Sequence, residues 1–225
     1  MAITFDAASS ASGSTGVSTM SWNHTVGAGT DRMLVAAAAF QTFGSSDVVV
    51  SQVTYAGTTM TKTIGLTNQL DAGRLITAEL WTMLNPPVGT TRVEITWSQS
   101  SISDPPSGHS VSYLGTTGIG NVASTLGNSS ARSVSVTLQD AGSWLVAGHI
   151  WVGVLPGTTV SGETIRAMST NPLRLLGDSA PGTSGVNTFN ITGGVVLQWI
   201  MVGLELRPSA VVGVVPRMTL VGVGP

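Results

Sequence analysis

The residues that could bind a metal ion or move a proton are few and scattered along this sequence. The three histidines, His24, His109 and His149, each lack a second histidine or carboxylate at the spacing of a metal site such as HxxxH or HxH. We therefore interpret them as hydrogen-bonded core or surface histidines, although ligands distant in the sequence remain an alternative. The chain has no cysteine, which excludes disulfides, thiol catalysis and cysteine-bound metals.

The carboxylates and serines predict no catalytic residue. A glycosidase needs two carboxylates that face each other across a sugar, and Glu79 with Glu94 is the one pair on neighbouring strand-like runs. Ion pairing with Arg74 or Arg92 explains the two glutamates equally well. A serine nucleophile elbow, G-x-S-x-G, is absent, since Gly108-His-Ser-Val-Ser lacks the second glycine. No cofactor-binding fingerprint is found either.

Six tryptophans raise the question of carbohydrate binding, because sugar rings stack on exposed aromatic faces. Four of them lie within apolar runs and are predicted to fill the core: Trp81, Trp97, Trp144 and Trp199. Trp151 lies on the opposite face of its strand from Trp144. Together with Trp22 it is the better candidate for an exposed ring, which would bind a glycan or form part of an interface.

The elements that carry these residues are predicted to be short strands. Glycine and proline, 28 and 10 residues, interrupt the chain too often for a long amphipathic helix. Residues Arg92–Ser98 alternate, with Val93, Ile95 and Trp97 on one face, and Ser133–Leu138 repeats this pattern. Four runs are apolar on both faces, as in central strands covered on two sides: Met33–Phe40, Arg74–Met83, Ser143–Val152 and Val195–Leu206.

Turn residues support the same fold class. Tyr55-Ala-Gly-Thr-Thr59 predicts a tight connection between strands Val48–Tyr55 and Thr58–Ile64, and Asn85-Pro-Pro-Val-Gly89 ends a strand. Roughly ten to twelve strands of this kind indicate an all-β protein, an antiparallel β-sandwich of jelly-roll type. We expect one such domain over residues 1–209, and no convincing internal repeat is visible.

Residues 210–225 form a different kind of segment. They contain six valines and one charge, Arg217, and Pro208 and Pro216 prevent them from extending the preceding strand. We predict an extended apolar arm that packs back on its own domain or docks on a neighbouring subunit. The residues expected to contact a partner are Val211, Val212, Val214, Val215, Pro216, Met218, Leu220, Val221 and Val223.

Charge is scarce throughout the chain. Charged residues make up 9%, against roughly 25% in an ordinary soluble domain. The net charge is −2 and Lys62 is the only lysine, so nucleic-acid binding through a basic patch is excluded. No signal peptide or membrane-spanning segment is predicted. We expect neither a nucleic acid nor a membrane as a partner.

Several segments, taken in order, resemble a known domain: Asp31-Arg-Met-Leu-Val-Ala, Val53-Thr-Tyr-Ala-Gly-Thr-Thr-Met-Thr, Glu79-Leu-Trp-Thr-Met-Leu-Asn-Pro-Pro-Val-Gly-Thr, Val111-Ser-Tyr-Leu-Gly, Ser143-Trp-Leu-Val-Ala-Gly and Trp199–Pro208. Together they resemble a jelly-roll-like β-sandwich domain of bacteriophage structural proteins and secreted bacterial surface proteins. The resemblance covers roughly residues 3–209. It implies a fold and no catalytic residue.

Two features favour the phage setting over the secreted one. The chain starts at Met1 without an export signal, and a neutral surface with an apolar arm suits a subunit that is buried against its neighbours. We expect a non-enzymatic virion protein assembled in the host cytoplasm, most specifically a capsid decoration or cement protein. Its partners would be the major capsid protein or other virion proteins and copies of itself in a trimer or dimer. The alternative is a carbohydrate-binding or adhesive module of a surface or tail-fibre protein.

Overall fold

The computed structural model describes residues 1–43, 48–69, 73–100, 104–154, 159–160, 163–170, 173–179, 181–193 and 195–209. Within these residues every regular element is a β-strand, and the seventeen strands form four antiparallel sheets. The predicted all-β, antiparallel sandwich is therefore confirmed. The predicted arm, residues 210–225, lies outside the described residues.

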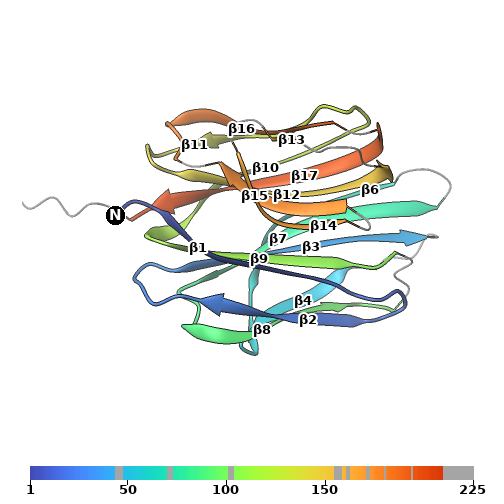
Figure 1. Cartoon of the computed structure of the whole chain (residues 1–225), viewed down its shortest axis with the longest axis horizontal. Coiled ribbons are helices and arrows are strands. Elements are labelled where there is room, and N and C mark those ends of the chain that lie inside the picture. The colour runs from blue at the N-terminus through green and yellow to red at the C-terminus, as the bar shows by residue number, and fades with distance from the viewer. Residues whose placement is uncertain are drawn as a thin grey trace, which may run out of the picture.

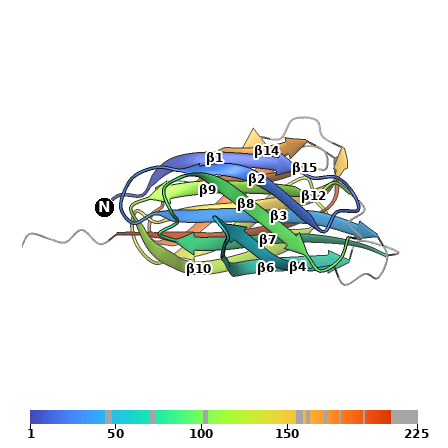
Figure 2. The ribbon, with the colours of Figure 1, turned by 90° about the horizontal axis from the view of Figure 1, so that it is seen from below.

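The first half of the chain forms two sheets. The N-inner sheet has the order β1 (Thr4–Ser12), β9 (Ser107–Leu114), β3 (Met33–Phe43), β7 (Arg74–Leu84) and β6 (Thr61–Gln69). The N-outer sheet has the order β2 (Thr19–Val26), β8 (Gly89–Trp97), β4 (Val50–Tyr55) and β5 (Thr58–Thr59). Figure 2 shows β2 and β8 of the outer sheet lying across the inner strands.

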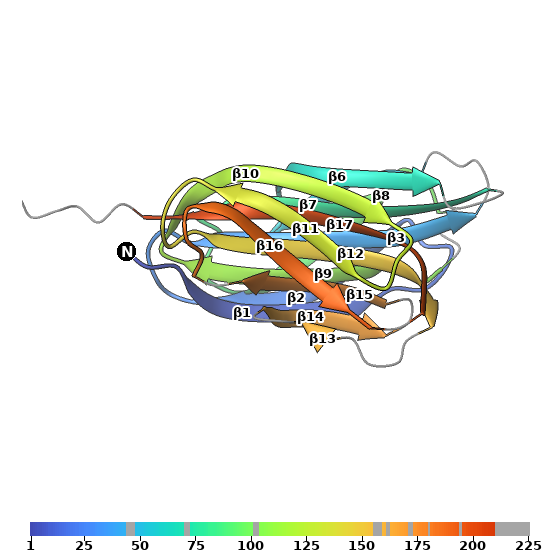
Figure 3. The same cartoon turned by 90° about the horizontal axis from the view of Figure 1, so that it is seen from above.

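The second half forms two more sheets. The C-inner sheet has the order β10 (Thr116–Gly127), β17 (Val195–Pro208), β12 (Trp144–Val154), β15 (Leu173–Ser179) and β14 (Thr164–Thr170). The C-outer sheet has the order β11 (Arg132–Leu138), β16 (Gly185–Thr192) and β13 (Thr159–Val160). Figure 3 shows β11 and β16 of this sheet above the C-inner strands. Figure 1 shows the resulting stack of four layers, with the two inner sheets face to face.

The two halves have the same topology. If β10 is matched to β1 and β17 to β9, the inner orders β1-β9-β3-β7-β6 and β10-β17-β12-β15-β14 coincide. The outer orders β2-β8-β4 and β11-β16-β13 coincide as well. Apart from β5 and β6, the first half alternates between its sheets in jelly-roll order. The chain is thus a tandem structural repeat, which corrects the expectation that it contains no internal repeat.

Equivalent residues in the two repeats share backbone conformation. Met33 and Trp144 begin β3 and β12, and two residues earlier Asp31 and Gly142 both have a positive φ, 54° and 85°. The first residues of β8 and β16, Gly89 and Gly185, have φ values of 110° and 106°. Positive φ is a conformation that L residues rarely adopt, so its recurrence at matched positions supports the repeat independently of strand order.

Three hydrophobic cores separate the four layers. The central core lies between the inner sheets and includes Val35 and Leu80 of the first repeat with Val146 and Leu204 of the second. Each outer sheet covers the other face of its inner sheet over a core of its own. Because the central inner strands β3, β7, β12 and β17 are covered on both faces, the prediction of central strands that are apolar throughout is confirmed.

The alternating strands and the tight turn also agree with expectation. In β8 the side chains of Val93, Ile95 and Trp97 are buried, and β11 buries its valines in the same way. Ala56 and Gly57 form a two-residue turn with φ values of 51° and 76°, typical of a type I′ hairpin. The predicted strand Thr58–Ile64 is split, however: β5 ends at Thr59, and β6 begins at Thr61 in the N-inner sheet.

Candidate functional site

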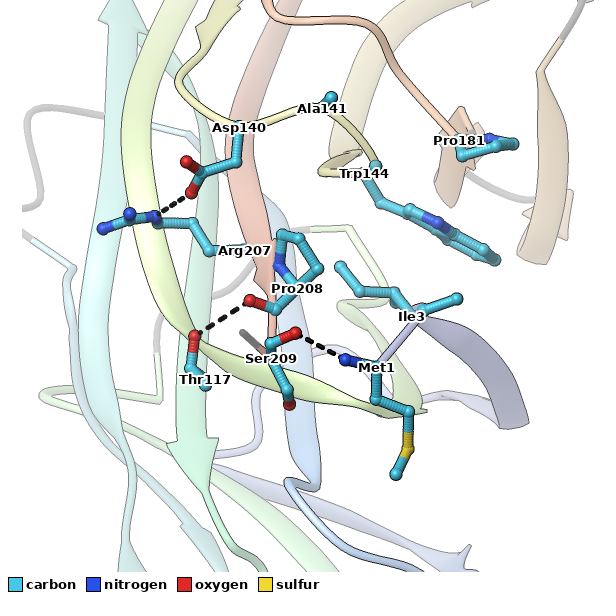
Figure 4. Close-up of a pocket in the computed structure, with 12 residues that line it drawn as sticks. Met1, Ile3, Thr117, Asp140, Ala141, Trp144, Pro181, Arg207, Pro208 and Ser209 are labelled. Carbon is cyan, nitrogen blue, oxygen red and sulfur yellow. Dashed lines mark hydrogen bonds and ion pairs between the residues drawn. The ribbon is translucent and has the colours of Figure 1, made fainter. Parts of the chain in front are cut away.

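A cavity of about 700 Å³ lies at the end of the second repeat, beside the N-terminus and the root of the arm (Figure 4). Its volume falls in the range of about 300–1,000 Å³ of small-molecule pockets, which also admits a few side chains of a peptide. Most of the lining is apolar or small. The lining residues are Met1, Ala2, Ile3, Thr117, Asp140, Ala141, Gly142, Trp144, Pro181, Arg207, Pro208 and Ser209.

The cavity combines an apolar wall with one ion pair. The rings of Trp144 and Pro181 and the side chain of Ile3 line it, from three segments distant in the sequence (Figure 4). Arg207 Nε lies 2.7 Å from Asp140 Oδ2, and this hydrogen bond, with the charge of Asp140, raises the pKa of Arg207. The two charges of this pair neutralise each other, and the Met1 ammonium adds a positive group to the lining, so the cavity combines apolar surface with a few polar groups.

The root of the arm is tied to this end of the molecule by Ser209. The Ser209 N–H donates to the Gly115 carbonyl at 2.8 Å, and its hydroxyl donates to Asp31 Oδ2 at 2.5 Å. The Ser209 carbonyl accepts a hydrogen bond of 2.5 Å from the Met1 amine. Ser209, the last described residue, is therefore held at the rim of the cavity by contacts to the first repeat and to the connection between the repeats.

A second group of side chains is connected by hydrogen bonds in the manner of a serine–histidine–carboxylate relay. The Trp22 indole N–H donates to Ser110 Oγ at 2.8 Å, and Ser110 Oγ lies 2.9 Å from His24 Nδ1. On the other side of the ring, His24 Nε2 lies 3.0 Å from Ser112 Oγ, which donates to Asp6 Oδ2 at 2.7 Å. Since Ser112 gives its proton to Asp6, His24 must carry its proton on Nε2 and accept from Ser110 at Nδ1.

This chain of hydrogen bonds is structural. Ser110, Ser112 and His24 are fully buried between the sheets of the first repeat, so a substrate cannot reach the Ser110 hydroxyl. The network instead satisfies polar groups in the core and links β1, β2 and β9. The sequence analysis missed it, because its members lie on three strands and follow no short motif.

We predict that the neutral state of His24 makes stability pH-dependent. Burial lowers the pKa of His24 from 6.5 to about 4, because the charged ring would be held away from water. Protonation would also place a second N–H on the ring, facing the Ser110 hydroxyl. The unfolded chain binds the proton more readily, so stability is complete above pH 6.5 and decreases as the pH falls to about 4. The expected loss is about 3 kcal/mol, since one pKa unit corresponds to about 1.4 kcal/mol.

Urea unfolding at pH 7.5, 5.5 and 4.0 measures this dependence. In the His24→Gln variant the loss between pH 7.5 and 4.0 should be about 3 kcal/mol smaller than in the natural chain. His149, whose pKa burial holds well below its ordinary value, contributes in the same direction and remains in both proteins. Equal pH dependence in the two proteins would contradict the assignment to His24.

The prediction that Trp22 and Trp151 are exposed rings is wrong. Trp22 is 8% exposed and bonded to Ser110, and Trp151 is 1% exposed. The ring centroids of Trp151 and His149 lie 4.4 Å apart, and the buried Arg132 guanidinium lies 4.8 Å from the Trp151 centroid. Trp151 does point to the opposite face from Trp144, but the C-outer sheet covers that face. The four tryptophans predicted to be in the core, Trp81, Trp97, Trp144 and Trp199, are buried.

The candidate pair of Glu79 and Glu94 does not form. Glu79 lies on β7 of the N-inner sheet, where it is buried and accepts hydrogen bonds from Lys62 Nζ at 2.5 Å and Trp81 Nε1 at 2.8 Å. Glu94 lies on β8 of the N-outer sheet and pairs with Arg92. The two carboxylates belong to different layers, so they cannot face each other across a sugar. The alternative, ion pairing with Arg74 or Arg92, is confirmed for Glu94, whereas Glu79 is buried and pairs with Lys62.

The three histidines, His24, His109 and His149, are all buried. In the part of the chain that the structure describes, no three histidine, aspartate or glutamate side chains are grouped so as to hold a metal ion. That same part has no helix long and apolar enough to cross a membrane. Comparison of the chain with protein-family models, with curated proteins and with solved structures found no match.

Proposed function

We propose that this protein is a non-enzymatic structural subunit of a bacteriophage virion, most specifically a capsid decoration or cement protein. In this function the sandwich lies on the shell, and the arm holds neighbouring subunits together. The observation that carries the proposal is a charge-poor sandwich whose last described residue, Ser209, lines a largely apolar cavity and is followed in the sequence by an apolar segment. The resemblance of residues 3–209 to jelly-roll-like domains of phage structural proteins supports the virion as the setting.

The surface carries even fewer charged side chains than the composition alone suggests. Four charged side chains, Glu79, Arg132, Asp178 and Glu205, are buried inside the protein, so they do not contribute to the surface. Several large apolar side chains are exposed, among them Val122 and Leu126 on β10. Depletion of charge is a feature of interface cores, and low surface charge favours association.

The energetics of the arm favour repeated weak contacts. Each fully buried valine, leucine or methionine side chain contributes about 1.5–3 kcal/mol, while ordering each backbone residue costs about 1–2 kcal/mol. The two contributions nearly cancel over an arm of this composition, so a single arm binds modestly. On a shell with many copies, simultaneous engagement raises the overall affinity through effective concentration.

The alternative, a carbohydrate-binding module, depended on two exposed aromatic rings. Trp22 and Trp151, the residues that would stack on a sugar, are buried in the cores of the two repeats. No other observation favours glycan binding. We therefore propose the assembly function alone.

We expect deletion of Val211–Pro225 to abolish binding to phage capsids without unfolding the sandwich. Co-sedimentation with particles from the phage that encodes the chain should pellet the full chain and leave the shortened chain in the supernatant. The circular dichroism spectrum should stay that of a folded β protein, because the described core ends at Ser209. If the shortened chain pellets as well as the full chain, the arm is not the attachment element and the proposal fails.

A further inference from the structure

The core of the second repeat contains a buried arginine that forms no ion pair within the described part of the chain. Arg132 begins β11 of the C-outer sheet and is 1% exposed. Its Nη2 donates to the Gly193 carbonyl at 2.9 Å, whereas its Nε and Nη1 are buried and have no hydrogen-bond partner among the described residues. Arginine stays charged in proteins, and a buried charge is costly unless it is paired.

The other buried charges show that this arrangement is exceptional. Among the described residues, the buried carboxylates Glu79, Asp178 and Glu205 each accept at least two hydrogen bonds. Arg132 has no such partner. Glu163 Oε1 accepts from Asn190 N at 2.9 Å, and Glu163 forms no ion pair with Arg132. Burial lowers the pKa of Arg132, and no carboxylate offsets this effect.

Two more buried side chains beside Arg132 have unpartnered nitrogen atoms. The Arg132 guanidinium lies 4.8 Å from the centroid of the Trp151 ring, and the ring centroids of Trp151 and His149 lie 4.4 Å apart. His149 and Trp151 are both 1% exposed, and they share one face of β12 because they are two residues apart. Trp151 Nε1 and both ring nitrogens of His149 have no hydrogen-bond partner among the described residues.

The cluster of Arg132, His149 and Trp151 has one net positive charge and an excess of donors. Burial, and then the charge of Arg132, hold the pKa of His149 well below its ordinary value, so the imidazole is neutral and one of its nitrogens donates. The Trp151 indole can only donate, and so can the free nitrogens of Arg132. The face of the Trp151 ring attracts the guanidinium, but it accepts no hydrogen bond at the guanidinium edge.

We propose that this cluster is the binding site of one small inorganic anion, a halide such as chloride, between the C-inner and C-outer sheets. A halide carries a single negative charge and only accepts hydrogen bonds, which is what the cluster lacks. The surrounding core is apolar and includes Val134, Ile191 and Met201, so a single atom fits better than a larger, doubly charged anion. Water would satisfy donors and leave the charge unpaired. The inference is independent of the proposed function.

Urea unfolding of the full chain in sodium chloride and in sodium gluconate tests the site. The two salts are compared at equal ionic strength, so both screen exposed charges alike, and gluconate is too large to enter a packed core. Above the dissociation constant, each tenfold rise in chloride should raise the folding equilibrium constant about tenfold, or by about 1.4 kcal/mol. Equal stability in the two salts at every concentration would overturn the proposal.

A matched pair of variants locates the anion. Arg132→Met keeps an unbranched side chain without its charge, and the difference between the two salts should disappear. Arg92→Met makes the same change at an exposed arginine of β8 and should keep the full difference. If Arg132→Met responds to chloride as the natural chain does, chloride binds elsewhere and the assignment to Arg132 is wrong.

Bromide provides a test that needs no variant, in case Arg132→Met does not fold. Bromide replaces chloride in halide sites and scatters X-rays anomalously. Crystals of the natural chain grown in sodium bromide should show an anomalous peak against the Arg132 guanidinium. Anomalous peaks confined to the protein surface, or a water molecule beside Arg132 without anomalous signal, would overturn the proposal.

Discussion

Replacing Asp178 with alanine is expected to lower the free energy of unfolding by about 3–5 kcal/mol, the cost of breaking a buried ion pair. Asp178 lies on β15 and is 1% exposed. It accepts hydrogen bonds from Arg166 Nε at 2.7 Å, Arg166 Nη2 at 3.0 Å and the Tyr113 hydroxyl at 2.8 Å. Tyr113 belongs to the first repeat and Arg166 to the second, so the carboxylate joins the two repeats across the central core.

The loss is large because the buried Tyr113 hydroxyl and the partly buried Arg166 guanidinium would keep no acceptor at this site. Burial, followed by the charge of Asp178, raises the pKa of Tyr113 well above its ordinary value, so the phenol stays protonated and donates. The Arg166 guanidinium also lies 4.1 Å from the centroid of the Phe5 ring on β1. Without Asp178 it would have to find water or remain desolvated.

Urea unfolding of the natural chain, Asp178→Ala and Tyr113→Phe measures this contribution. Tyr113→Phe is the matched control, because it removes one neutral donor and leaves the ion pair, at an expected cost of about 1 kcal/mol. For a chain of this length, 4 kcal/mol corresponds to a melting temperature lower by about 8–16 °C. If both substitutions lowered the free energy of unfolding equally, the ion pair between Asp178 and Arg166 would contribute nothing beyond the hydrogen bond from Tyr113.

Replacing Glu205 with alanine is expected to cost a similar amount, about 3–5 kcal/mol. Glu205 on β17 is fully buried and accepts from three donors: Gln139 N at 2.7 Å, Ser143 Oγ at 2.7 Å and Asn121 N at 3.0 Å. Each hydrogen bond to a charged group contributes about 1.5–3 kcal/mol, and each buried donor left unpaired costs about 1–3 kcal/mol. These donors hold the connection between β11 and β12 against β10.

The first repeat contains the matched control for this prediction. There Asp6 on β1 accepts from Gly27 N at 2.8 Å and from Ser112 Oγ at 2.7 Å, and Gly27 starts the connection from β2 to β3 just as Gln139 starts that from β11 to β12. Asp6 is only partly buried, so Asp6→Ala should cost about 1–2 kcal/mol. Thermal melts of both variants test the ranking, and a larger effect of Asp6→Ala would contradict this account of the two carboxylates.

The individual strands and turns could be predicted because their signals are local. Alternation in Arg92–Ser98 and the Ala56-Gly57 turn depend on the pleat and on allowed backbone angles, which neighbouring residues determine. Length and composition were equally informative about the fold class. Elements such as β7 and β12 were recognised as central because both of their faces are apolar.

The repeat could not be predicted from the sequence, because matched positions of the two repeats carry different residue types that make different kinds of contact. In the first repeat Leu114 lies against Gly29, where an added Cβ would come within 2.9 Å of a leucine methyl. At the equivalent positions of the second repeat Arg207 pairs with Asp140. The anchoring carboxylate likewise moves from β1 in the first repeat to β17 in the second. Strand pairing preserves the topology, whereas side chains need only fill the same space.

Exposure of single residues was misjudged for a related reason. Alternation shows that Trp144 and Trp151 lie on opposite faces of β12, and it cannot show that a further sheet covers each face. The relay from Trp22 to Asp6 was missed because hydrogen bonds between distant strands leave no spacing in the chain. The cavity was missed as well, since its walls come from both ends of the chain.

The sequence by itself determined that this protein is an all-β sandwich with little charge and an apolar C-terminal segment, because backbone preference and hydropathy act between neighbouring residues. Only the tertiary structure decided that there are two sandwiches stacked in four layers, which residues meet in the cores, and where the cavity lies. Those features depend on contacts between residues that are far apart in the chain, and a contact of that kind leaves no periodicity or motif to read.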